Sequence, residues 1–109
     1  MRKAEIKFNE QTAGVLLQDE NGFHFRYDEI YLRSANPIAI SLTLPLQEAA
    51  FDSLVLFPFF DGLIPEGWLL DIAEANWKLN PRDRMGLLLA CCKDCIGAVS
   101  VHPVESEEV

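Results

Sequence analysis

The chain has 109 residues, half of them hydrophobic and 24% charged, which is the length and composition of one ordinary globular domain and not of a disordered chain. Its formal net charge is -8 at pH 7, and this excess of negative charge argues against direct nucleic-acid binding. A basic protein partner is the better electrostatic complement.

The N-terminus and the cysteines favour a protein of the reducing cytoplasm. Glu5 and Lys7 interrupt the apolar run that a signal peptide needs after its charged start. The 3 cysteines all lie within residues 91–95, and an odd, clustered set does not make a disulfide framework. No apolar stretch of the sequence is long enough to span a bilayer.

The N-terminal part of the chain alternates apolar and polar residues in the way that antiparallel strands do. Strands are predicted over Ala4–Asn9, Gly14–Asp19 and Phe23–Asp28, with a turn cluster over Asn9–Gly14. Asn21-Gly22 is a strong hairpin signal between the second and third strands, because both residues tolerate a positive φ. The pattern predicts an antiparallel meander with one face exposed to water.

The middle of the chain is predicted to contain little regular structure. Asp28–Ser34 favours a short helical turn that ends before Asn36-Pro37. A fourth extended segment is expected over Pro37–Pro45, and Gln47–Asp52 is expected to be a loop or a single turn. The apolar side chains of the fourth segment are predicted to share one face: Ile38, Ile40, Leu42 and Leu44.

The C-terminal half is predicted to form helices and one closing strand. Pro58 is best placed at the first position of a short helix, and Glu66 suits the first turn of the next one. The expected elements are helices at Pro58–Leu63, Glu66–Leu79 and Asp83–Cys92, a strand at Ile96–His102 and an acidic tail at Pro103–Val109. The predicted class is therefore α+β, in a single domain over residues 1–109, with an N-terminal antiparallel β-meander, helices and a closing β-strand.

The helix predicted over Glu66–Leu79 has more apolar surface than one core needs. On a helical wheel Trp68 lies in one apolar lobe and Trp77 in another, and their combined arc is about twice the stripe of a helix packed on one core. Either the domain covers both lobes or one lobe faces a partner. Trp side chains are seldom fully buried and are enriched at binding hot spots, which favours Trp68 as a partner anchor.

No constellation of residues in the sequence supports an enzyme, a metal site or a cofactor. There is no serine in a G-x-S-x-G context and no glycine-rich phosphate loop. Cys92 and Cys95 have CxxC spacing, but a second pair of zinc ligands is missing, so buried thiols are the favoured interpretation. His24 is expected on the exposed side of a strand. Arg82 and Arg84 are expected at a solvated helix start or, as the alternative, against acidic groups of a partner.

Three stretches of the chain resemble the N-terminal subdomain of HipA-family toxin kinases. They are SLTLPL at Ser41–Leu46, FPFFDGLIPEG at Phe57–Gly67 and KDCIGAVSVHP at Lys93–Pro103. Their order and rough spacing match the family, and Gly62 replaces an Asn that many members carry. The phosphate loop, catalytic Asp and metal-binding Asp of the kinase body have no counterpart here, so the resemblance does not imply phosphotransfer.

The resemblance implies two alternatives for function. One is a standalone antitoxin resembling HipS of tripartite HipB–HipS–HipT systems, which binds and inhibits a separate HipT-like serine/threonine kinase and meets DNA only through a HipB-like protein. The other is an N-terminal regulatory fragment of a full-length HipA-like kinase. Met1 and the acidic end favour the first. The predicted partner-binding residues are Trp68, Glu66, Gly67, Leu69, Ile72, Phe59 and Ile64, with the core as the alternative for the last two.

Overall fold

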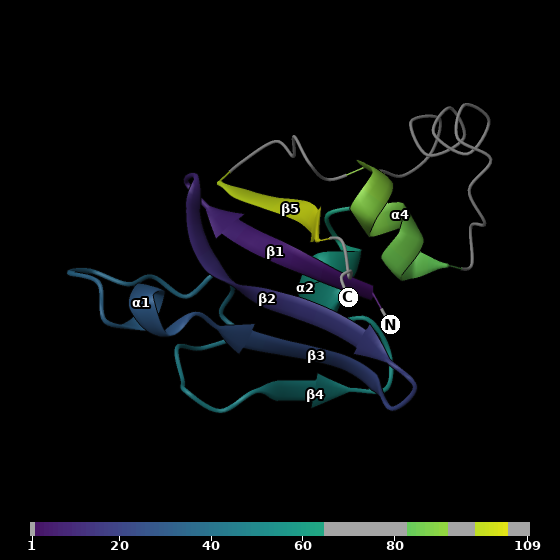
Figure 1. The fold of residues 1–109 in the computed structure, drawn as a ribbon, viewed down its shortest axis with the longest axis horizontal. Coiled ribbons are helices and arrows are strands. Elements are labelled where there is room, and N and C mark those ends of the chain that lie inside the picture. The colour runs from purple at the N-terminus through teal and green to yellow at the C-terminus, as the bar shows by residue number, and fades with distance from the viewer. Residues whose placement is uncertain (1, 65–82, 92–97, 105–109) are drawn as a thin grey trace.

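A five-stranded antiparallel sheet in the order β4-β3-β2-β1-β5 organises the chain (Figure 1). The structure is a computed structural model that describes residues 2–64, 83–91 and 98–104. The strands are β1 Arg2–Phe8, β2 Gln11–Asp19, β3 Gly22–Tyr27, β4 Phe51–Ser53 and β5 Val99–Val104. The helices are α1 Glu29–Leu32, α2 Pro58–Asp61 and α4 Arg84–Cys91. This architecture confirms the predicted α+β class, the N-terminal antiparallel meander and the closing strand.

The turn between β1 and β2 is shorter than the sequence predicted. Asn9 and Glu10 both have a positive φ, 51° and 69°, and these two residues alone reverse the chain. Such a two-residue turn matches the twist of the flanking strands, so β2 can begin at Gln11. The predicted turn cluster Asn9–Gly14 was therefore too long. The ladder absorbs one extra residue at a bulge opposite Ile6 and Lys7.

One face of the sheet is buried beneath α2 and α4. Strand side chains that point to this face alternate with exposed ones, as a half-buried sheet requires. The buried strand residues are Ala4, Ile6, Ala13, Leu16, Phe23, Phe25, Tyr27, Val99 and Val101. The helices contribute Phe60, Met85, Leu87 and Leu88, which are fully buried. In Figure 1, α2 lies behind the sheet, on the side that these residues face.

The segment Pro37–Pro45 is not the regular extended segment that its alternation predicted. It contains a single isolated bridge, and Leu42 is 100% exposed while Ile40 and Leu44 are buried. The hydroxyl of Tyr27 explains the difference, because it accepts the N–H of Ile40 at 3.0 Å and donates to the carbonyl of Leu44. A side chain thus satisfies backbone groups that a neighbouring strand would otherwise pair.

The edge strands also differ from the predicted elements. Strand β4 begins within the predicted loop Gln47–Asp52 and ends one residue beyond it. The sequence did not predict this strand, because 3 residues are too few to show a strand period. Strand β5 runs on through Pro103 and Val104, which the sequence placed in the acidic tail. A proline is tolerated there because β5 is at the edge of the sheet, where no further strand needs its missing N–H.

The described helices begin close to where the sequence placed them. Helix α2 has Pro58 in its first turn, and α1 is capped by Asp28, whose carboxylate accepts the N–H of Tyr31 at 3.2 Å. The helix predicted over Glu66–Leu79 lies outside the described residues. No helix within the described ranges is long and apolar enough to cross a membrane.

Removing the Tyr27 hydroxyl tests its role in positioning the loop. We expect Tyr27→Phe to lower the free energy of unfolding by about 1–3 kcal/mol, because it leaves the buried N–H of Ile40 and carbonyl of Leu44 without this partner. Urea unfolding followed by fluorescence measures the change. Tyr31→Phe is the control, with a smaller expected loss, because the Tyr31 hydroxyl bonds the more exposed backbone of Ile38. Equal losses in both variants would contradict this account.

Candidate partner-binding surface

The predicted partner-binding residues fall in and after α2, on the stretch of chain that leads to α4. Five of them lie outside the described residues, and their roles stay predictions: Glu66, Gly67, Trp68, Leu69 and Ile72. The other two, Phe59 and Ile64, are described. The described residues 64 and 83 bracket the part of the chain that carries Trp68.

Phe59 and Ile64 differ in how much surface they can offer to a partner. Ile64 is 2% exposed and belongs to the core, so its side chain presents no surface in this conformation. Ile64 therefore fits the alternative that the sequence left open for it, a core residue and not a direct partner contact. Phe59 is only partly buried, with its ring centroid 5.2 Å from that of Phe60 in an edge-on contact. The fully buried Phe60 therefore holds the Phe59 ring in position, and that ring is still partly accessible to solvent.

Two ion pairs hold the start of α4 against α2 and β1. Arg84 Nε donates to Asp61 Oδ1 at 2.6 Å, which joins α4 to the end of α2. The guanidinium of Arg2 donates to both oxygens of Asp83 at 2.8 and 2.6 Å, a bidentate contact between β1 and the residue before α4. Asp83 also accepts the N–H of Gly86 at 3.1 Å and so caps the helix. Arg84 lies at the start of α4 and more than a third of its side chain is exposed, as expected, and the structure adds its pairing with Asp61. Arg82 lies outside the described residues.

The charge state of Asp83 follows from these contacts. The hydrogen bond from Arg2 is the main cause that lowers the pKa of Asp83 below 3.8, and the N–H of Gly86 adds to it against the opposing effect of burial. A carboxyl with a lowered folded-state pKa stabilises the fold above its unfolded pKa, and that contribution is lost as pH falls through the lowered value. The tie between β1 and α4 is therefore intact at neutral pH.

His24 on the outer face of the sheet lies between two carboxylates. Its Nδ1 is 2.6 Å from Asp52 Oδ1 on β4, and its Nε2 is 3.0 Å from Asp19 Oδ1 at the end of β2. The hydrogen bond to Asp52, followed by the one to Asp19, raises the pKa of His24 above 6.5. The reciprocal hydrogen bond lowers the pKa of Asp19 below 3.8. The protonated ring thus links the edge strand β4 to the β2–β3 hairpin.

The sequence predicted the exposed face for His24 but not its partners. Asp19 comes 5 residues earlier, across the Asn21-Gly22 turn, so the hairpin pattern contained that signal. Asp52 lies in β4, which the sequence did not predict, so no local sequence pattern indicated that Asp52 would lie next to His24. Within the described residues no group of three or more His, Cys, Asp or Glu side chains is arranged to hold a metal ion. The Cys92 and Cys95 pair lies outside those residues.

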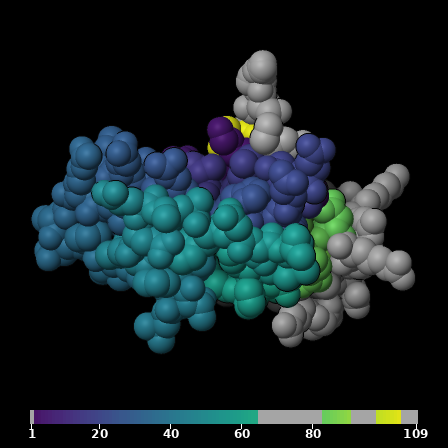
Figure 2. Space-filling model, turned by 90° about the horizontal axis from the view of Figure 1, so that it is seen from below, coloured from purple at the N-terminus to yellow at the C-terminus, as the bar shows by residue number. Residues whose placement is uncertain are grey.

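A second apolar region lies on the loops that flank β4. Leu54 and Val55, which follow β4, are 86% and 67% exposed, and the loop before β4 exposes Ile38, Leu42 and Leu46. Seen from below, the residues numbered from about 40 to 60 form a continuous band along this side of the molecule (Figure 2). The prediction that Ile38 and Leu42 share one face with Ile40 and Leu44 was wrong, because Ile40 and Leu44 are buried whereas Ile38 and Leu42 are exposed.

Comparison with known proteins identifies the fold family. A family model for the HipA N-terminal domain matches residues 4–102, which include α2, α4 and most of the sheet. The chain belongs to the HipA N-terminal domain family. The resemblance carried by the three sequence stretches is thereby confirmed. The match is to the N-terminal domain of HipA and not to a kinase domain.

Individual relatives agree with this assignment to the HipA N-terminal domain. A solved structure described as the N-terminal domain of HipA toxin superposes with a TM-score of 0.74 at 28% identity, covering 98% of this chain and 96% of that one. An uncharacterized protein of Haemophilus influenzae is 32% identical over 102 residues, which are 94% of this chain and 92% of the relative. A Sinorhizobium fredii protein named "Putative kinase Y4mE" is 26% identical over 110 residues, and this chain spans 26% of its length.

The His24 cluster predicts a defined pH dependence of stability. A raised folded-state pKa means that the cluster stabilises the fold fully below about 6.5 and loses this contribution as pH rises through the raised value. The lowered pKa of Asp19 means that its contribution is present above about 3.8 and lost at lower pH. We expect His24→Asn to remove the decline in the urea midpoint as pH rises above about 6.5.

The other histidine supplies the control for this measurement. His102 Nε2 lies 2.8 Å from the hydroxyl of Ser100, so His102→Asn leaves the carboxylate cluster intact and is expected to keep the wild-type decline. An unchanged decline in His24→Asn would show that the cluster does not control the pH dependence.

The Asp61–Arg84 pair predicts a measurable coupling between α2 and α4. Both side chains are more than a third exposed, so solvent screens the pair and we expect a coupling free energy of only about 0.5 kcal/mol from a double-mutant cycle with alanine at each position. Glu29–Arg33 is the control pair, at 3.8 Å and with both side chains more than two-thirds exposed. Its coupling is expected to be near zero. A larger coupling in the control pair would contradict the assignment of Asp61–Arg84 as the tie between the helices.

Proposed function

We propose that this chain is an antitoxin that binds and inhibits a separate HipA-like serine/threonine kinase, as HipS does with HipT. The contrast between two relatives carries the proposal. The similar stretch makes up 92% of the Haemophilus influenzae protein but only 26% of the kinase-named Sinorhizobium fredii protein. The same domain is thus found both nearly alone and within a longer protein. A domain that packs on a kinase body within one chain has the complementary surface to bind a kinase encoded separately.

The proposed interface is centred on Trp68. The surplus apolar arc of its predicted helix motivates this choice, with Glu66, Gly67, Leu69 and Ile72 around it. Phe59 supports the anchor from α2 because its ring is only partly buried. Ile64 supports the interface indirectly. Its side chain is buried in the core, so it anchors the point from which the chain continues to Trp68.

The charge of the chain supports the choice of partner. A net charge of -8 favours encounter with a basic kinase cleft and disfavours direct contact with DNA. Any link to an operator then runs through a HipB-like DNA-binding protein. We assign the chain no phosphotransfer of its own and place it in the cytoplasm, where clustered thiols stay reduced.

An alternative function is that of an N-terminal regulatory subdomain within a full-length HipA-like kinase. The Sinorhizobium fredii relative favours it, because this chain matches only part of that protein. The reading frames that flank the gene separate the two functions. A neighbouring kinase frame that lacks this domain supports the antitoxin, whereas a kinase body continuous with this chain supports the subdomain.

Reconstitution with that neighbouring kinase tests the antitoxin directly. We expect the purified chain to form a stable complex with the kinase and to suppress its autophosphorylation in proportion to the fraction bound. Full kinase activity in the saturated complex would reject the proposal. Phosphotransfer by the purified chain alone would overturn the assignment of a non-catalytic role.

Replacing the anchor tests the interface. We expect Trp68→Ala to weaken kinase binding by about 2 kcal/mol or more, which is roughly thirtyfold in Kd, because a buried Trp commonly dominates an interface. Isothermal titration calorimetry measures the loss, and circular dichroism checks that the fold is kept. Trp77→Ala, in the other predicted lobe, is the matched control with a smaller expected effect. Equal losses in the two variants would reject Trp68 as the anchor.

A further inference from the structure

The turn that joins β2 and β3 presents an exposed asparagine directly before a glycine. Asp19 pairs with Gly22 across the ladder. The two residues between them, Glu20 and Asn21, form the turn, and both are exposed. In Figure 1 this turn lies at the edge of the molecule, where β2 passes into β3. Water therefore reaches Asn21 and the peptide bond that follows it.

The fold requires a glycine after Asn21. Gly22 has a φ of +124°, a backbone conformation that residues with a side chain rarely adopt. An added Cβ would also lie 2.4 Å from the carbonyl oxygen of Ser53, the last residue of β4. The turn and the approach of the edge strand thus both exclude a side chain at this position. The nitrogen of Gly22 is therefore left without the shielding that a Cβ would give it.

The fold does not require an asparagine at the position before this glycine. Among the described residues other than glycine, only Asn9 and Glu10 have a positive φ, so the turn does not need the tolerance for that conformation which favours asparagine. The N–H of Asn21 donates to Asp19 Oδ1 at 2.8 Å, a bond that any residue except proline can form. The side-chain amide of Asn21 forms no hydrogen bond with the described residues. Its carboxamide is therefore free to turn towards the nitrogen of Gly22.

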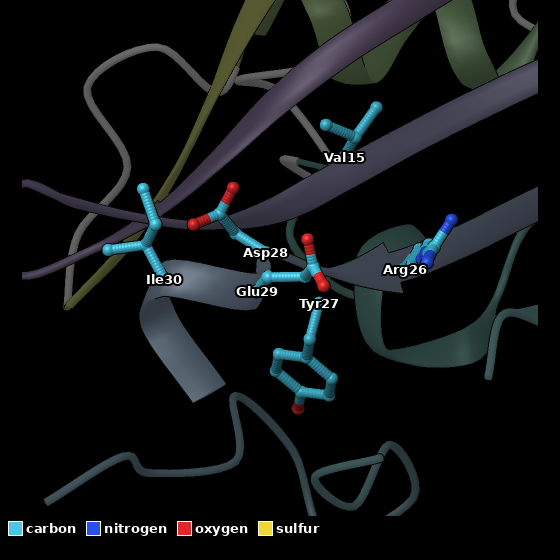
Figure 3. A pocket seen from close by; sticks show the side chains of 6 residues that line it. All are labelled: Val15, Arg26, Tyr27, Asp28, Glu29 and Ile30. Carbon is cyan, nitrogen blue, oxygen red and sulfur yellow. The ribbon is translucent and has the colours of Figure 1, made fainter. Parts of the chain in front are cut away.

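The other end of the same hairpin is held differently. There β3 leads into α1, beside a hollow of about 340 Å³ (Figure 3). The hollow is lined by Val15, Arg26, Tyr27, Asp28, Glu29 and Ile30. The side chain of Asp28 is fixed at this end, because it caps α1 by accepting the N–H of Tyr31 at 3.2 Å. Within the described ranges no comparable bond holds the side chain of Asn21.

We propose that Asn21-Gly22 is a site of spontaneous covalent modification, at which Asn21 loses its side-chain nitrogen as ammonia. The nitrogen of Gly22, deprotonated by hydroxide, attacks the Cγ carbon of Asn21. The N–Cγ bond forms and the bond from Cγ to the amide nitrogen breaks. The departing nitrogen takes a proton from water, which releases ammonia, regenerates hydroxide and leaves a cyclic succinimide. Water then adds to one of the two ring carbonyls and opens the ring to an aspartyl or an isoaspartyl residue.

The two products change the turn in different ways. Both add a carboxylate next to Asp19 and Glu20, in a chain whose net charge is already -8. The isoaspartyl product also lengthens the main chain by a methylene group, because the peptide bond then runs through the former side chain. The pairing of Asp19 with Gly22 and the contact of Gly22 with Ser53 depend on the length of this turn. The isoaspartyl form therefore loosens this end of the hairpin and the edge strand β4 beside it. The site lies outside α2, so the inference does not depend on the proposed kinase contact.

Mass spectrometry of the aged full-length chain tests the proposal. The folded protein is incubated at mildly alkaline pH and then digested with trypsin, which releases residues 8–26 as one peptide that contains both Asn9 and Asn21. We expect the mass gain of an amide-to-acid exchange at Asn21 at least about tenfold faster than at Asn9, because the residue after Asn9 has a side chain that shields its nitrogen. The rate is expected to rise with pH, since hydroxide removes the proton. Equal rates at Asn9 and Asn21 would overturn the proposal.

Variants at the same position separate the effects of the two products. Asn21→Gln is the matched control, because its longer side chain cyclises far less readily, and it is expected to keep its mass and its urea midpoint through the same incubation. Anion exchange isolates the modified wild-type chain. We expect the urea midpoint of its isoaspartyl form to fall below that of Asn21→Asp, which has the added charge but not the added main-chain atom. Equal midpoints would overturn the role assigned to the longer main chain.

The unfolded chain shows whether the folded turn permits the reaction. A second sample is incubated in guanidinium chloride at the same pH, where the turn no longer restrains Asn21. We expect both samples to gain the modification. The proposal is overturned if the folded chain keeps Asn21 intact over an incubation that converts it fully in the unfolded chain.

Discussion

The packing of Phe25 is the contact on which the rest of the structure depends. Its fully buried ring meets Tyr27 at 4.9 Å, Phe60 of α2 at 5.5 Å and Phe51 of the edge strand at 6.3 Å between ring centroids. The ring lies over Gly14, where an added Cβ would come within 2.9 Å of it. One side chain therefore joins three strands and a helix, and the missing side chain of Gly14 is what gives it room.

This packing gives the sheet two chemically different faces. Because α2 and α4 are drawn onto the aromatic face, the other face of the sheet keeps its charges in contact with water. The ion pairs of Asp61 with Arg84 and Arg2 with Asp83 then tie α2, α4 and β1 together around residues 64 and 83. In this member of the HipA N-terminal domain family, α2 and α4 therefore lie on one side of the sheet and the charged side chains of the strands on the other.

Particular residues show how far prediction from the sequence reached. The strict alternation of Phe23, Phe25 and Tyr27 predicted both the strand and its buried face, and Pro58 predicted the start of α2. Leu42 was misplaced because alternation was also present in a segment whose backbone is bound by a tyrosine hydroxyl. Of the proposed interface residues, the structure describes Phe59, which is partly buried, and Ile64, whose burial depended on contacts distant in the chain.

The sequence by itself determined the meander, the family and the net charge, because hydrophobic period, turn residues and short motifs are local properties. Only the tertiary structure decided which charges are paired. Arg2 and Asp83 are separated by 81 positions, and Arg84 and Asp61 by 23, so no spacing along the chain announces either pair. Lys3, Lys7 and Arg26 come from two strands, and they meet on one face because the β-ladder, and not the sequence, places them there.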